Sequence, residues 1–95
     1  MTVFDLLREI YRQADSLISS EASVREDDWR LLRLRGAVSV LIEVAEQLHD
    51  RESYAVLDDL EYACNHIGFV NSKAEVVLRE AGAKIESLGK HEGQV

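Results

Sequence analysis

Apolar residues recur at alternating steps of three and four in four separate segments of this 95-residue chain. Such spacing follows one face of an α-helix and is typical of helices that pack along their lengths. The repeating positions are Val3, Leu7, Ile10, Ala14 and Leu17; Leu31, Leu34, Val38, Leu41, Ala45 and Leu48; Val56, Leu60, Ala63, Ile67 and Val70; Ala74, Leu78, Ala81, Ile85 and Leu88. With short loops between the segments, the pattern predicts an all-α fold, a small antiparallel bundle of four helices.

The chain is long enough for one domain, predicted to be helical over 1–89 and followed by a flexible C-terminal tail over 90–95. Capping boxes place the first helix after Thr2 and the second after Ser23, where Glu26 completes the box. The second helix is predicted to run to about Asp50. The third covers 53–67 before a capping Gly68, and the fourth ends near Leu88.

The second segment is predicted to be a long central helix, although its stretch AVSVLIEVA is rich in strand-forming residues. Beside its main stripe it carries a second one, formed by Trp29, Ala37, Val40 and Val44, so we expect neighbours on two sides. Gly36 lies inside this helix, where glycine costs about 1 kcal/mol relative to alanine. We interpret it as a point of close approach by a neighbouring helix, and a kink is the alternative.

A second helix of about 26 residues would be roughly 39 Å long, and its neighbours of about 16 residues roughly 24 Å. One end would therefore project, exposing an apolar group made of Trp29, Leu31, Leu32 and Leu34. A second copy around a two-fold axis would cover it, so we predict a homodimer built on this helix. The alternative is a monomer whose first helix folds back over that end.

Arginines surround the tryptophan at the start of this helix. Arg25 and Arg33 stand four residues either side of Trp29 and are predicted to lie against its ring. Because Trp and Arg are frequent interface anchors, the predicted partner or dimer interface consists of Trp29, Leu32, Arg25, Arg33 and Gly36. The alternatives are a mixed charged surface and nucleic-acid contact, which a net charge of −7 opposes.

Carboxylates gather further along, in a predicted acidic surface made of Glu43, Glu46, Asp50, Asp58 and Asp59. Such an excess of negative charge could imitate a phosphate backbone. An alternative function is therefore an acidic nucleic-acid mimic that inhibits a nuclease or a DNA-binding complex, as accessory proteins of phages and mobile elements do. The simpler interpretation is a solvated face.

Residue patterns for catalysis are lacking, so we predict no enzyme activity, no catalytic residues and no cofactor. Glu46 and His49 form one Glu-x-x-His pair, but a di-iron bundle needs two such pairs and two further glutamates, so no metal site is predicted. The single cysteine, Cys64, lies among apolar residues and is expected to be a small buried hydrophobe.

The sequence thus favours a protein-binding module, an adaptor, inhibitor or regulator of another protein, which acts as a homodimer. A transcription accessory factor and a metal-binding bundle are weaker alternatives. No apolar run approaches the roughly 18 residues of a membrane span, and we expect a cytoplasmic location. The expected partners are a second copy and an unidentified protein; nucleic acid is disfavoured as a partner, and no membrane is expected.

Overall fold

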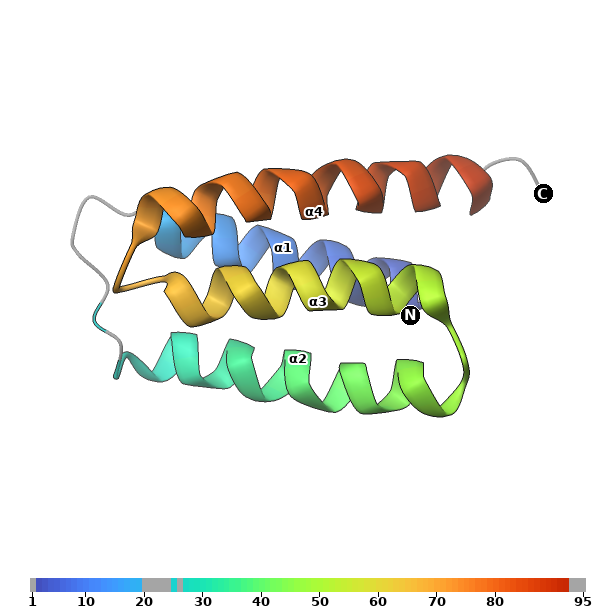
Figure 1. Cartoon of the computed structure of the whole chain (residues 1–95), viewed down its shortest axis with the longest axis horizontal. Helices are drawn as coiled ribbons and strands as arrows, with labels where there is room; N and C mark the ends of the chain where they lie inside the picture. Colours follow the sequence, from blue (N-terminus) through green and yellow to red (C-terminus); the bar gives the residue numbers. More distant parts are fainter. Residues whose placement is uncertain (1, 20–24, 26, 93–95) are drawn as a thin grey trace.

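A computed structural model describes residues 2–19, 25 and 27–92 of the chain. These residues form four helices: α1 (Val3–Ser19), α2 (Trp29–Gln47), α3 (Arg51–His66) and α4 (Asn71–Glu92). Successive helices run in opposite directions, side by side along the molecule (Figure 1). The predicted all-α, antiparallel four-helix bundle is therefore confirmed.

The core is one cluster of apolar side chains contributed by all four helices. Leu7 of α1, Leu31 of α2, Leu60 of α3 and Leu78 of α4 are each completely buried, and all four belong to the predicted stripes. Burial of these side chains is the main stabilising contribution, because each fully buried leucine contributes about 1.5–3 kcal/mol relative to its exposed state.

The helix ends agree with the sequence signals in two places. The Asp5 amide donates to Thr2 Oγ1 and the Thr2 amide donates to Asp5 Oδ2, both at 3.1 Å, which is the predicted capping box. Gly68 has φ 90°, a left-handed conformation suited to glycine, just after the end of α3. The stretch AVSVLIEVA, which is rich in strand-forming residues, lies inside α2 and is helical.

The second helix begins later and ends earlier than predicted. Asp28 is the residue that caps α2, and the helix ends at Gln47 rather than near Asp50. The predicted capping pair, Ser23 and Glu26, lies outside the described residues. With 19 residues α2 is about 28 Å long, and α4 with 22 residues is longer. The predicted overhang of a uniquely long second helix is therefore wrong.

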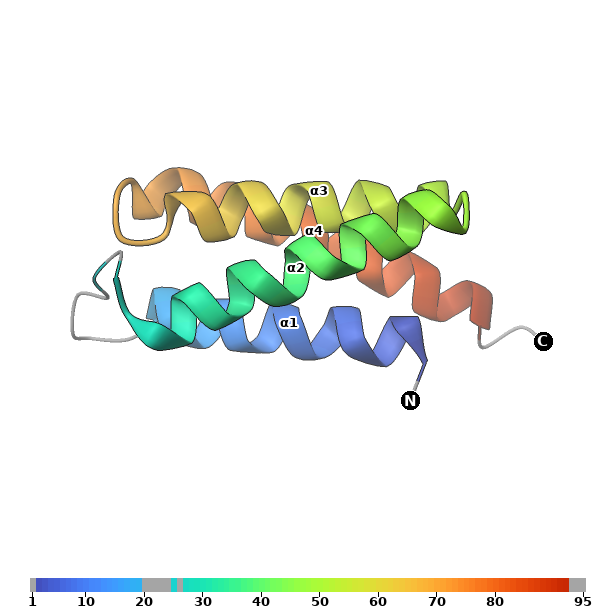
Figure 2. The ribbon, with the colours of Figure 1, turned by 90° about the horizontal axis from the view of Figure 1, so that it is seen from below.

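The second helix also occupies an outer position instead of the predicted central one. Among the described residues α2 packs on α3 and, less extensively, on α1, and it does not contact α4. Figure 2 shows α2 slanting across the bundle, with its first turns beside α1 and its last turns beside α3. By contrast, α1 and α3 each pack against all three other helices. One long face of α2 is therefore not covered by any of the described helices.

Two aromatic rings of α1 lie against two glycines of the antiparallel α4. A Cβ added to Gly82 would lie 2.9 Å from Tyr11 Cε2, and one added to Gly89 would lie 2.7 Å from Phe4 Cζ. Gly89 therefore allows close packing rather than ending the helix, and the predicted end near Leu88 is wrong because α4 continues to Glu92. Of the predicted tail, residues 93–95 lie outside the described part of the chain.

Replacing Gly36 by alanine is expected to stabilise the monomer by about 0.5–1 kcal/mol, since alanine is the better helix former. Nothing lies within 4 Å of a Cβ at this position, so the gain meets no steric cost. The matched variant Gly82→Ala should lose that gain against the Tyr11 ring. Urea unfolding of both variants at high dilution measures the difference, and equal stabilisation would contradict the packing of Tyr11 on Gly82.

Candidate protein-binding surface

One side of α2 exposes a row of apolar side chains to solvent, which we call the α2 outer face. Exposure reaches 67% for Trp29, 50% for Leu32, 61% for Val40 and 40% for Val44. Gly36 and Ala37, also exposed, lie between them. The α2 outer face therefore consists of Trp29, Leu32, Gly36, Ala37, Val40 and Val44. Steps of three and four join Trp29, Leu32, Gly36, Val40 and Val44 along one side of the helix, and Ala37 lies next to Gly36.

The opposite side of α2 is buried in the core through Leu31, Leu34, Val38 and Ala45. The helix thus has two apolar faces, of which the bundle covers one. The other exposed large apolar residues are spread over several elements: Val3 of α1; Tyr54 and Tyr62 of α3; Val76 of α4; and Leu48, Phe69 and Val70 in the turns. By contrast, the exposed apolar residues of the α2 outer face lie together on one helix, and contiguous apolar surface is typical of interaction sites.

Within the chain, Gly36 is not the predicted point of helix–helix approach, because a Cβ there would meet open space. Of the four apolar residues expected to project, Trp29 and Leu32 are exposed, whereas Leu31 and Leu34 are buried. The sequence did contain the signal for Val40 and Val44, because both belong to the second stripe. Because the second stripe predicts a neighbour within the bundle, Val40 and Val44 are not among the predicted interface residues.

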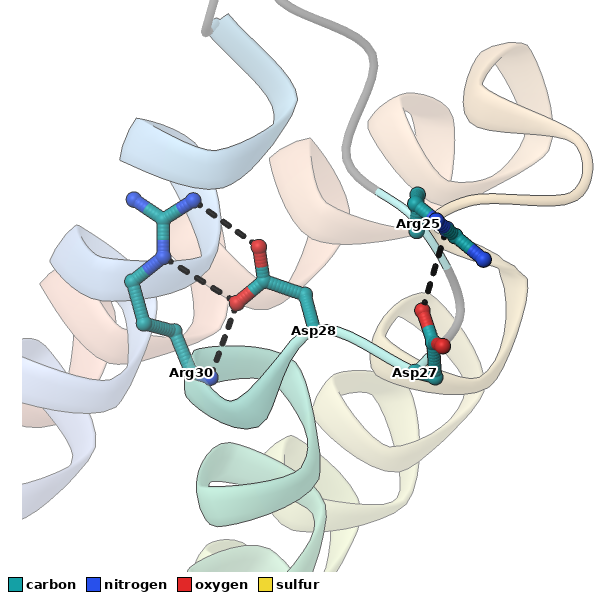
Figure 3. A network of polar contacts seen from close by, with 4 residues as sticks. All are labelled: Arg25, Asp27, Asp28 and Arg30. Atoms are coloured by element: carbon teal, nitrogen blue, oxygen red, sulfur yellow. Dashed lines mark hydrogen bonds and ion pairs between the residues drawn. The ribbon is translucent and has the colours of Figure 1, made fainter.

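Polar contacts fix the first turn of α2, next to Trp29 (Figure 3). Asp28 Oδ1 accepts from the Arg30 amide at 2.9 Å, and the two Asp28 oxygens accept from the Arg30 guanidinium at 3.1 and 3.0 Å. Arg25 forms an ion pair with Asp27, with Nε and Oδ1 3.3 Å apart. Asp28 thus caps the N-terminus of α2 directly before Trp29, the first residue of the helix.

The predicted stacking of Arg25 on Trp29 is wrong. Arg25 precedes the helix, so its spacing of four from Trp29 does not place it one turn below the indole. Arg33 is inside α2 and lines an open hollow together with Trp29 and Arg30, opposite Arg12 and Ser16 of α1. The structure therefore brings together Trp29, Leu32, Arg33 and Gly36 on α2, and places Arg25 outside the helix.

The ion pair at the start of α2 has a predictable pH dependence. The side-chain bond from Arg30 and the bond from its amide lower the pKa of Asp28 below its ordinary value. A lowered pKa in the folded state stabilises the fold above about pH 4, and this contribution is lost as pH falls through the folded-state pKa.

Asp28→Asn keeps a capping oxygen but loses the charge. Wild type should therefore melt at a higher temperature than this variant at pH 7, and the difference should shrink by pH 2.5. Circular dichroism melts measure it, and a constant difference would contradict the assignment.

The five residues of the predicted acidic surface differ in their surroundings. Asp50 is the N-cap of α3, where it accepts from the Ser53 amide at 3.1 Å and from the Ser53 hydroxyl at 2.7 Å. Asp59 Oδ2 accepts from Lys84 Nζ of α4 at 2.7 Å, a bond that raises the pKa of Lys84. Glu43, Glu46 and Asp58 are exposed. Two of the five carboxylates thus have partners within the fold.

The residues considered for chemistry are Cys64 and the pair Glu46 and His49. Cys64 is completely buried, as predicted, and burial raises the pKa of its thiol to about 11. His49 lies beyond α2 with φ 53°, so it and Glu46 do not share a helical face. In the described part of the chain no group of three or more His, Cys, Asp and Glu side chains is arranged to hold a metal ion.

Over the same described residues, none of the helices has the length and apolar character needed to cross a membrane. Comparison of the chain with protein-family models, with curated proteins and with solved structures gave no match.

Proposed function

We propose that this chain is a helical protein-binding module that acts as a homodimer, and that the α2 outer face joins the two copies. The observation that carries the proposal is the row of exposed apolar side chains on the one face of α2 that its own bundle leaves uncovered. Covering such surface is favourable by about 25 cal/mol for each Å² of apolar area removed from water. A cytoplasmic location is part of the same proposal.

The composition of this face supports a protein partner. Trp29 is a large aromatic side chain and Arg33 lies beside it in the same hollow, and both residue types are common interface anchors. Leu32, Val40 and Val44 add aliphatic surface further along the helix. The acidic nucleic-acid mimic has weaker support, since Asp50 and Asp59 are bound to Ser53 and Lys84.

A pair of valines tests the proposal with matched chemistry. Val40 on the α2 outer face is 61% exposed and Val76 on α4 is 59% exposed. We expect Val40→Ala to weaken self-association about 3- to 10-fold, the effect of about 0.7–1.4 kcal/mol for lost apolar contact. Val76→Ala should leave the dissociation constant within twofold of wild type.

Sedimentation equilibrium over a concentration series measures both dissociation constants. The dissociation constant of the Gly36→Ala variant can be measured in the same way, because its monomer is expected to be stably folded. Equal effects of the two valine substitutions would show that association, if it occurs, uses a surface other than the α2 outer face. A wild-type mass of 10.7 kDa at every concentration would refute the homodimer.

A further inference from the structure

We infer that the second copy lies antiparallel along α2, with the two-fold axis passing near residue 38, so that Gly36 of each copy faces Val40 of the other. This inference rests on the proposed function and adds the orientation and register of the pair. It follows from the order in which bulky, small, basic and acidic side chains occur along the exposed side of the helix.

The middle of the α2 outer face combines a residue without a side chain, Gly36, and a projecting one, Val40. Gly36 leaves open space above the helix, and Val40 projects one turn further along with 61% of its surface exposed. The two residues stand two positions either side of Val38. An antiparallel pair sets each projecting valine over the other copy's glycine, whereas a parallel pair sets valine against valine and glycine against glycine. Close-packed interfaces favour the first arrangement.

The same register matches the outer parts of the face. Leu32 and Val44 stand six positions either side of residue 38, so each leucine comes to the level of the other copy's valine. Trp29 and Gln47 stand nine positions either side, so the indole meets the last turn of the opposite helix. Leu32 thus lies at the level of Val44 of the other copy, and Gly36 at the level of its Val40.

The charges give the strongest reason for the antiparallel direction. Arg33, in the first half of α2, and Glu43, in the second half, stand five positions either side of residue 38, and both are exposed. An antiparallel pair brings Arg33 of each copy to the level of Glu43 of the other, which gives two such pairs by symmetry. It also places the two helix dipoles in opposite directions. Parallel pairing would bring arginine to arginine and glutamate to glutamate.

Charge reversal tests this register. We expect Glu43→Arg to weaken self-association about 5- to 30-fold, or about 1–2 kcal/mol, because the two symmetry-related Arg33–Glu43 ion pairs are lost and replaced by repulsion. This loss should occur even though the substitution moves the net charge of −7 toward zero, which by itself favours association. The double variant Arg33→Glu with Glu43→Arg keeps the net charge of the wild type and should recover most of the affinity.

Distances between spin labels test the direction independently. Single cysteines at the exposed positions Ser39 and Glu46 accept a thiol-specific nitroxide, and Cys64 is protected from labelling by its burial. At 1.5 Å per residue, antiparallel copies centred on residue 38 separate the two labels at position 39 by about 3 Å along the axis, and those at position 46 by about 24 Å. A parallel pair gives the same distance at both positions.

The outcomes separate this inference from the proposed function. Long distances at position 46 with short ones at 39, together with recovery in the double variant, support the antiparallel pair. Equal distances at both positions, or a Glu43→Arg variant that associates more tightly than wild type, would overturn the inference and leave a homodimer of another geometry. A wild-type chain that stays monomeric overturns both.

Discussion

Leu60→Ala lowers the free energy of unfolding by about 2–5 kcal/mol, because the substitution removes a completely buried side chain and leaves a cavity that the neighbouring helices fill only in part. Leu60 belongs to α3, which packs against all three other helices, so few neighbours are free to move inward. A domain of this size has about 5–14 kcal/mol of stability in total, so the loss is a large fraction of it. Urea unfolding followed by circular dichroism measures the change.

Leu32→Ala is the matched control for this prediction. It makes the same chemical change at a site that is 50% exposed on the α2 outer face. Under dilute conditions, where the chain is monomeric, we expect it to change the free energy of unfolding by less than about 1 kcal/mol. Its effect should appear at high concentration, as weaker self-association. If Leu60→Ala cost no more than Leu32→Ala, the placement of α3 at the centre of the core would be wrong.

Trp29→Ala is expected to weaken self-association by roughly 30-fold or more, which corresponds to the loss of about 2 kcal/mol or more at an interface hot spot. The indole is the largest side chain of the α2 outer face and is 67% exposed, so the monomer loses little packing when it is removed. The capping contacts of Asp28 that precede it do not depend on the indole. Helicity should therefore stay near that of wild type.

Sedimentation equilibrium gives the dissociation constants, and Val76→Ala is the reference for an exposed apolar residue outside the α2 outer face. The two changes of the Trp29 variant, in association and in helicity, must be measured together. Unchanged self-association would remove Trp29 from the interface. Weakened association with a large loss of helicity would show that the indole supports the fold of the monomer instead.

The fold was predictable because helical periodicity is a local signal. Leu7, Leu60 and Leu78 belong to the predicted stripes, and the backbone need only be helical for each stripe to form one face. Short connections then favour antiparallel neighbours. The bounds of α2 were less predictable, since Ser23 with Glu26 and Asp28 are both good capping signals. Local propensity does not choose between them, whereas the bonds from Arg30 to Asp28 do.

The position of α2 could not be read from the sequence, because a second apolar stripe has the same appearance whether a helix of the same chain or another molecule covers it. The sequence therefore predicts an internal neighbour for Val40 and Val44, whereas it places Trp29 in the predicted partner or dimer interface. Gly89 presents a similar ambiguity. Glycine both ends helices and allows close packing, and only the position of the Phe4 ring shows that here it does the latter.

Quenching of tryptophan fluorescence by acrylamide reports directly on whether a second copy covers the α2 outer face, because Trp29 is the only tryptophan of the chain. As protein concentration rises, quenching should fall and the emission maximum should shift to shorter wavelength, with the same midpoint as the rise in mass from 10.7 kDa toward twice that value. An indole that is quenched equally at all concentrations while the mass doubles, or a mass that never rises, would contradict the proposed interface.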